Sequence, residues 1–113
     1  MRTEWSRLNS GKVEAPKYLA ADLKEKFNKL AVDCEAMGTL TRLDADILAK
    51  YVLAENEYLI VSKRLQLALA AGDYQSADRW VNLQEKLTKQ CLTLGAELGL
   101  TPNARRTKGL FVP

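Results

Sequence analysis

The stretch Glu35–Leu48, EAMGTLTRLDADIL, contains the boundary between two predicted helices. Gly38 can adopt the left-handed conformation that ends a helix at little steric cost, so the first helix should stop there. Thr41, followed three residues later by Asp44, is typical of a helix start, because its hydroxyl can accept hydrogen bonds from the free N–H groups of the first turn. Two helices therefore meet here through a tight turn.

The helix before this corner is predicted from about Ala20 to Met37 and is apolar on one face. Large apolar residues recur every three or four positions, which keeps them on one side of a helix. They are Leu19, Leu23, Phe27, Leu30, Cys34 and Met37. We expect this face to be buried, and the opposite, lysine-bearing face to be solvated or, alternatively, to contact phosphate.

The helix after the corner, from about Arg42 to Ala70, is apolar on two sides. One side should face the subunit's own core; it carries Leu43, Ile47, Tyr51, Ala54, Tyr58, Val61, Leu65 and Leu69. The other side carries Leu48, Val52, Leu53, Leu59, Ile60 and Leu67. Soluble monomers rarely expose an apolar patch of this size, so these six residues are predicted to form an oligomer interface.

A third helix is predicted from about Tyr74 to Leu98, with Gly72 ending the previous helix and Asp73 as the cap. The short loop makes the second and third helices an antiparallel hairpin, against which the first helix packs. The sequence therefore predicts an all-α, oligomeric fold. Its parts are a basic mobile arm over residues 1–17, a three-helix oligomerisation domain over 18–100, and a short helical turn with a basic and apolar tail over 101–113.

Charge is concentrated at the two ends of the chain. The 113 residues carry 17 Lys and Arg against 14 Asp and Glu, a net charge of +3. Residues 1–17 contribute +2 and residues 101–113 contribute +3, which leaves −2 for the middle. Any contact with a polyanion should therefore involve the ends, although the charge of one subunit is small for that purpose.

No catalytic chemistry is indicated by the sequence. There is no histidine, and we find no glycine-rich phosphate loop, no nucleophile elbow and no metal-ligand spacing. Cys34 and Cys91 fall on apolar helix faces and are expected to be buried thiols. We expect no enzyme activity, no cofactor and no metal.

No long apolar run or signal-peptide core is present either. The longest apolar runs fall well short of the roughly 20 residues that span a bilayer, and the N-terminal segment has no apolar core of the kind a signal peptide needs. We expect no membrane contact and a cytoplasmic location.

Several segments, in this order, resemble the small terminase subunit of tailed bacteriophages. The resemblance extends from Ala15 to Arg106 and is carried by Ala15–Leu19, Phe27, Leu30, the corner Met37–Asp44, Leu48, Tyr51, Tyr58 and the segment Leu98-Gly99-Leu100-Thr101-Pro102-Asn103-Ala104-Arg105. The chain differs from the usual family pattern in its short connection Ala70–Tyr74 and in Phe27, where the family often has Trp.

The resemblance implies a non-catalytic packaging factor in the host bacterial cytoplasm. Such subunits form ring homo-oligomers, recognise double-stranded viral DNA and present it to the large terminase subunit, which is the ATPase and nuclease. A ring would also repeat the few basic residues of each chain.

On this reading, basic residues at the chain ends are the candidate DNA contacts. Those at the N-terminal side are Arg2, Arg7, Lys12, Lys17 and Lys24. Those assigned to DNA or to the large subunit are Arg105, Arg106, Lys108 and Phe111. Two alternatives remain at this stage: a satellite-encoded relative that binds a helper phage's small subunit and redirects packaging, and a helical oligomer unrelated to DNA.

Overall fold

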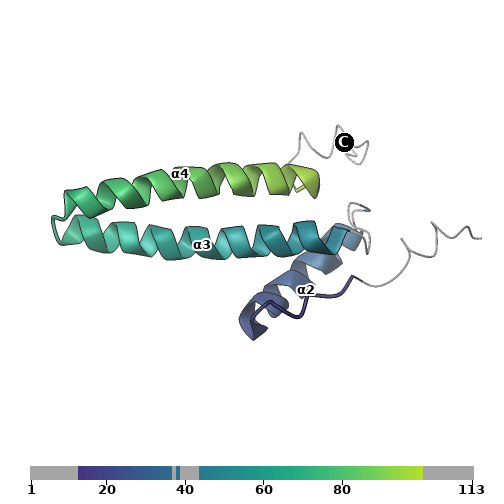
Figure 1. The fold of residues 1–113 in the computed structure, drawn as a ribbon. Helices are drawn as coiled ribbons and strands as arrows, with labels where there is room; N and C mark the ends of the chain where they lie inside the picture. Colours follow the sequence, from purple (N-terminus) through teal and green to yellow (C-terminus); the bar gives the residue numbers. More distant parts are fainter. Residues whose placement is uncertain (1–12, 37, 39–43, 101–113) are drawn as a thin grey trace, which may run out of the picture.

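The computed structural model describes residues 13–36, 38 and 44–100, and within them all regular secondary structure is helical (Figure 1). Helix α2 spans Ala21–Ala36, α3 spans Ala45–Ala70 and α4 spans Tyr74–Glu97. The predicted all-α class is confirmed for this part of the chain. The predicted helix starts and ends agree with these bounds to within one residue, except at the start of α3.

Glycines end the helices, as the sequence predicts. Gly38, Gly72 and Gly99 have φ angles of 72°, 72° and 71°, which is the left-handed region that favours glycine. After α3, the Asp73 N–H donates to the carbonyl of Ala68 at 2.9 Å. After α4, the Leu100 N–H donates to the carbonyl of Gly95 at 2.8 Å. These bonds satisfy carbonyls that the last helical turn would otherwise leave without partners.

The starts of α3 and α4 differ. Asp73 caps α4, because its Oδ1 accepts from the Ser76 N–H at 3.1 Å. Helix α3 begins at Ala45, three residues after the predicted start, and Asp44 occupies its N-cap position. The predicted cap, Thr41, lies outside the described residues.

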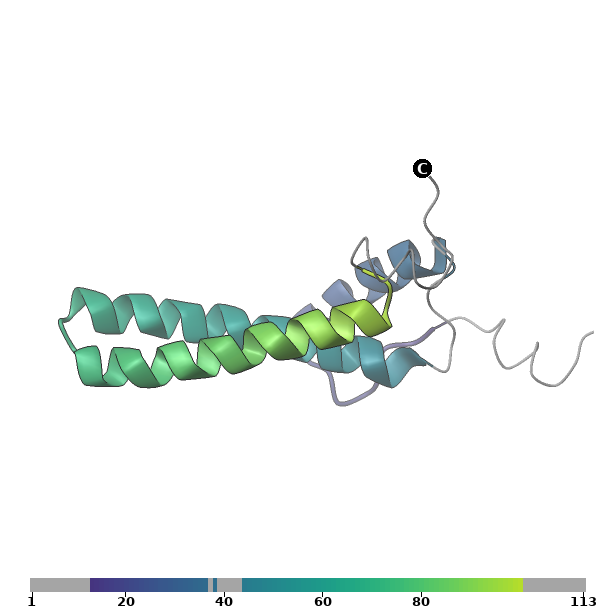
Figure 2. The same ribbon diagram turned by 90° about the horizontal axis from the view of Figure 1, so that it is seen from above.

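Helix α3 is the central element and packs on two sides. Helix α4 runs antiparallel beside its whole length, and α2 crosses its N-terminal half obliquely (Figures 1 and 2). At 1.5 Å per residue α3 is about 39 Å long, so its C-terminal half extends well beyond α2. The far end of the α3–α4 hairpin is closed by the turn at Gly72.

The main hydrophobic core lies at the end of the molecule where α2 covers α3. Its largest fully buried side chains are Phe27, Leu48, Leu98 and Cys34. The buried face predicted for the first helix is confirmed by the burial of Leu19, Leu23, Phe27 and Cys34. Leu100, just after α4, packs against the same cluster, as expected from the turn at Gly99.

The hydrophobic core includes a residue that precedes the first predicted helix. Val13 is only 3% exposed and belongs to the core cluster. Its N–H donates to Oε1 of Glu35, in the last turn of α2, at 3.4 Å. Val13 therefore packs on the body, because burial removes its apolar side chain from water. The boundary of the arm at residue 17 stays a prediction.

Candidate functional site: two grooves of the helical hairpin

Two open grooves follow the seam between α3 and α4, and we name them groove A and groove B. Groove A consists of two adjoining pockets that share Glu57 and Gln90. Its residues are Lys50, Leu53, Ala54, Glu57, Ile60, Val61, Leu83, Lys86, Leu87, Lys89, Gln90, Thr93 and Leu94. Groove B is lined by Tyr51, Glu55, Tyr58, Leu59, Thr88, Cys91 and Leu92.

The grooves lie on opposite sides of the hairpin. Successive residues of a helix are rotated by about 100°, and Ala54 and Val61 lie on the line of α3 that faces α4. Relative to that line, Leu53 and Ile60 turn to one side, whereas Tyr58 and Leu59 turn to the other. A single subunit therefore offers two different lateral surfaces.

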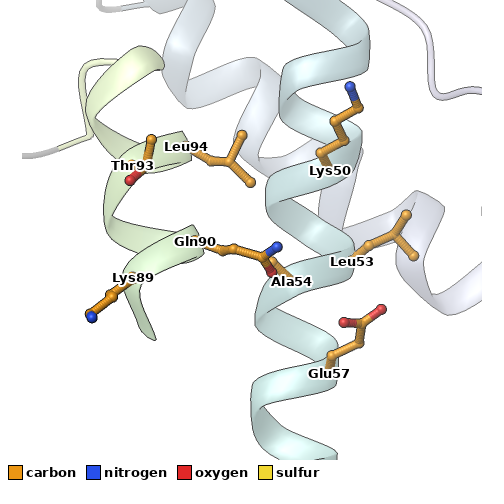
Figure 3. A pocket seen from close by; sticks show the side chains of 8 residues that line it. All are labelled: Lys50, Leu53, Ala54, Glu57, Lys89, Gln90, Thr93 and Leu94. Carbon is orange, nitrogen blue, oxygen red and sulfur yellow. The ribbon is translucent and has the colours of Figure 1, made fainter. Parts of the chain in front are cut away.

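The half of groove A nearer the core has an apolar floor and a polar rim. Leu94 and Gln90 reach from α4 toward α3, while Lys89 points away from the seam (Figure 3). The volume of this half is about 530 Å³. Leu53 is half-buried because it also packs against the core cluster under α2.

The other half of groove A is bordered by large aliphatic side chains that remain in contact with solvent. Ile60 on α3 is 51% exposed and Leu83 on α4 is 42% exposed. Leu67, one heptad after Ile60 on the same side of α3, is 63% exposed. Val61 and Leu87 fill the floor between the two helices. An apolar row of this kind is typical of a surface that binds another protein.

Groove B combines two tyrosines with exposed leucines. Leu59 and Leu92 are 50% and 60% exposed. Burial and a hydrogen bond with Glu55 raise the pKa of the Tyr51 hydroxyl. Burial and the nearby carboxylates of Glu55 and Glu57 raise the pKa of the Cys91 thiol. Both groups are therefore neutral at physiological pH, so Glu55 is the one charged residue in the lining of this groove.

The six residues predicted as the oligomer interface differ in their exposure to solvent. Leu48 and Val52 are 0% and 2% exposed and lie in the subunit's own core, so their assignment to an interface is wrong. The reason is that α2 covers the N-terminal half of the second apolar side of α3. Leu53, Leu59, Ile60 and Leu67 are half-buried or exposed, and their role in an interface stays a prediction.

Helix α4 contributes to both lateral surfaces, which the sequence did not predict. Leu83 on α4 borders groove A, and Leu92 on the same helix borders groove B. The signal was present, because Leu92 lies off the main apolar stripe of α4. Tyr58, assigned to the core, lines groove B.

Most of the predicted DNA contacts lie outside the described residues. These are Arg2, Arg7 and Lys12, and, at the other end, Arg105, Arg106, Lys108 and Phe111. Lys17 is exposed, and Lys24 is half-buried at the start of α2. The nearby Lys29 forms an exposed pair with Glu25, with Nζ and Oε1 3.5 Å apart.

In the part of the chain that the structure describes, no group of three His, Cys, Asp or Glu side chains is arranged to hold a metal ion. Among the described helices, none combines the length and the apolar character that a membrane span needs.

Comparison with known proteins gave one family match. The model of a family described as "Phage terminase, small subunit" matches residues 24–109. The matched range includes all of α3 and α4, most of α2 and the linings of both grooves. No curated protein and no solved structure was found to match the chain.

Proposed function

This chain belongs to the family of phage terminase small subunits, and on that premise we propose that it acts as a non-catalytic homo-oligomer in DNA packaging. In this role it binds double-stranded viral DNA in the host cytoplasm and presents it to the large terminase subunit. The observation that carries the proposal is the family match over residues 24–109. The exposed grooves of the hairpin supply the surface for assembly.

Self-association is supported by the apolar surface that the subunit does not cover itself. Helix α2 covers α3 only near the core, so Ile60 and Leu67 remain more than half exposed. Burying apolar surface stabilises by about 25 cal/mol per Å², and a repeated interface would bury these side chains together with Leu83. Contact between hairpins of neighbouring subunits is therefore favourable.

The charges of the two grooves favour pairing of groove A with groove B of the next subunit. Groove A carries Lys50, Lys86 and Lys89 against Glu57, a net charge of +2. Groove B carries Glu55. Pairing two copies of groove A would bring lysines against lysines, whereas pairing unlike grooves brings opposite charges together. A head-to-tail contact of this kind closes into a ring when the rotation between subunits allows it.

Substitution of the exposed aliphatic residues tests the assembly. We expect Ile60→Ala/Leu67→Ala to lower the mass measured by light scattering, because the variant loses apolar contact area between subunits. Its helical circular dichroism should be retained, since both side chains are exposed in the subunit. Val32→Ala is the matched control; Val32 is 65% exposed on α2 and lines neither groove.

Two outcomes would contradict the proposed assembly. One is a wild-type protein with the mass of a single chain at every concentration measured. The other is an assembled wild-type protein whose mass is unchanged in Ile60→Ala/Leu67→Ala.

A further inference from the structure

A pocket between α2 and α3 adjoins groove B, and we name it the α2 pocket. It has a volume of about 250 Å³ and is lined by Lys26, Lys29, Leu30, Val52 and Glu55. Glu55 also lines groove B, so the two hollows are neighbours along α3. The lateral surface that contains groove B therefore continues from the hairpin onto α2, where α2 crosses α3 (Figures 1 and 2).

The α2 pocket attracts negative charge. Lys26 and Lys29 are exposed and outnumber Glu55, which gives the lining a net charge of +1. Lys29 pairs with Glu25, but the two side chains are 75% and 70% exposed, and an ion pair in water of this kind contributes little. Val52 is only 2% exposed and gives the pocket an apolar floor, which strengthens an ion pair formed above it. The pocket therefore suits a carboxylate presented by an apolar surface.

Groove A presents a carboxylate at the same height along the hairpin. Glu57 is the one acidic residue in the lining of groove A and belongs to both of its halves. It is two residues from Glu55 on α3, about 3 Å along the helix axis. Lys89 lines the same half of groove A as Glu57, so its height is similar. In a closed ring whose axis runs along the hairpin, neighbours are related by rotation without a shift, so groups at equal heights meet.

The order of the helices decides which charges meet. Glu57 is on α3, whereas Lys89 is on α4 (Figure 3). Rotation keeps each helix at its own distance from the ring axis. Glu57 therefore faces the part of the neighbour where α3 meets α2, and Lys89 faces the part where α3 meets α4. Lys89 then meets Glu55, and Glu57 meets the two lysines of the α2 pocket.

We propose that the α2 pocket binds the Glu57 carboxylate of a second copy of this chain, so that α2 takes part in the contact between subunits. The inference rests on the proposed head-to-tail assembly. It adds to the pairing of the grooves a second charged contact of the opposite direction. Two such contacts side by side fix one register between neighbours, because a shift along the hairpin brings like charges together.

Charge reversal on either side of this contact tests the inference in the full chain. The variants are Glu57→Lys, Lys26→Glu/Lys29→Glu and the chain that carries all three substitutions. The matched control is Lys17→Glu/Lys63→Glu, which reverses two exposed cations that line neither groove nor the α2 pocket. Light scattering measures the mass as a function of protein concentration at low and at high salt.

We expect each one-sided reversal to weaken assembly and the triple variant to restore it. Either reversal alone places like charges against each other and should raise the dissociation constant at least about tenfold. The triple variant forms the same pairs with their signs exchanged. The net charge of the grooves alone predicts the opposite direction, because Glu57→Lys makes groove A more positive and would strengthen its contact with acidic groove B. The control should assemble like the wild-type protein.

A neutral variant keeps the test independent of the folding of α2. Lys29→Glu places two carboxylates one helical turn apart, at residues 25 and 29, which disfavours the helix. Lys26→Gln/Lys29→Gln avoids this repulsion. It should also assemble more weakly at low salt and depend less on salt than the wild-type protein, because it loses a screened attraction. Circular dichroism of each variant measures whether its helices are retained.

The outcomes separate the inference from the assembly on which it rests. A wild-type protein with the mass of a single chain at every concentration overturns both. If the wild-type protein assembles and the neutral variant or Glu57→Lys assembles equally well or better, head-to-tail assembly stands and the α2 contact is overturned. A triple variant that retains its helices but assembles no better than the one-sided reversals also overturns the pairing of Glu57 with the α2 pocket.

Discussion

Two glycines of the hairpin have opposite conformational requirements. Gly72 has a φ of +72°, and a Cβ added there would meet no atom within 4 Å. Gly95 is helical and buried in α4, where an added Cβ would lie 3.8 Å from Cε2 of Tyr51, an ordinary contact. At Gly72 the backbone conformation therefore opposes substitution by alanine, whereas at Gly95 both the backbone conformation and the available space allow it.

The same substitution should thus have opposite effects at these two positions. Gly72→Ala should lower the free energy of unfolding by about 1 to 2 kcal/mol, since an L-residue is strained in the left-handed region. Gly95→Ala should leave it unchanged or raise it by up to about 1 kcal/mol, because alanine is the better helix former. Urea unfolding followed by circular dichroism, at one protein concentration, measures both. Destabilisation of equal size at both sites would contradict this reasoning.

At the scale of one element, the start of α4 depends on a carboxylate. Asp73 accepts from the Ser76 N–H, and this hydrogen bond, with a smaller contribution from Arg79, holds the pKa of Asp73 below its ordinary value of 3.8. A lowered pKa in the folded state stabilises the fold above the unfolded-state pKa. That stabilisation is lost as the pH falls through the folded-state value.

We expect the difference in stability between the wild-type protein and Asp73→Asn to depend on pH in the acid range. Asparagine can still cap the helix but does not titrate. The wild-type protein should be the more stable of the two at neutral pH, and the difference should shrink as the pH falls below 3.8. Urea midpoints of both proteins across this range measure the effect. A difference that stays constant with pH would rule out the carboxylate as its source.

Helix α3 shows what the sequence could and could not predict. Periodicity and glycines predicted its length, its two apolar sides and its antiparallel partner, because these depend on neighbours along the chain. Whether a residue of the second apolar side is covered, as Leu48 is, or exposed, as Leu67 is, depends on the angle and position of α2. The spacing of residues contains no information on that crossing, so the interface was predicted over too much of the helix. Grooves A and B, which need two helices, were likewise not predicted.

At the scale of the whole molecule, the subunit has one lateral groove with net positive charge and one with net negative charge. Head-to-tail pairing predicts a specific pattern when groove charges are reversed. Lys50→Glu/Lys89→Glu makes groove A acidic, and Glu55→Lys makes groove B basic. Each variant alone should assemble at least about tenfold more weakly than the wild-type protein, because like charges then face each other.

Mixing the two variants should restore assembly. In alternating order, each acidic groove A meets a basic groove B, and each unchanged groove A meets an unchanged groove B. Light scattering of the separate and mixed proteins measures this. If Glu55→Lys alone assembled like the wild-type protein, groove B would not take part, and pairing of two copies of groove A would be the better description.

Because α2 covers only the N-terminal half of α3, one half of the hairpin forms the core and the other half stays exposed. The core around Phe27, Leu48 and Leu98 lies at one end of the hairpin. Val13 and Leu100, near the two ends of the described chain, contact the same core. The half of the hairpin beyond α2 contributes little to that core. Whole heptads could therefore be inserted or deleted near the Gly72 turn without disturbing the fold. Such changes would alter the length of the hairpins that line up in the proposed oligomer. Natural variation in length should accordingly accumulate at this tip.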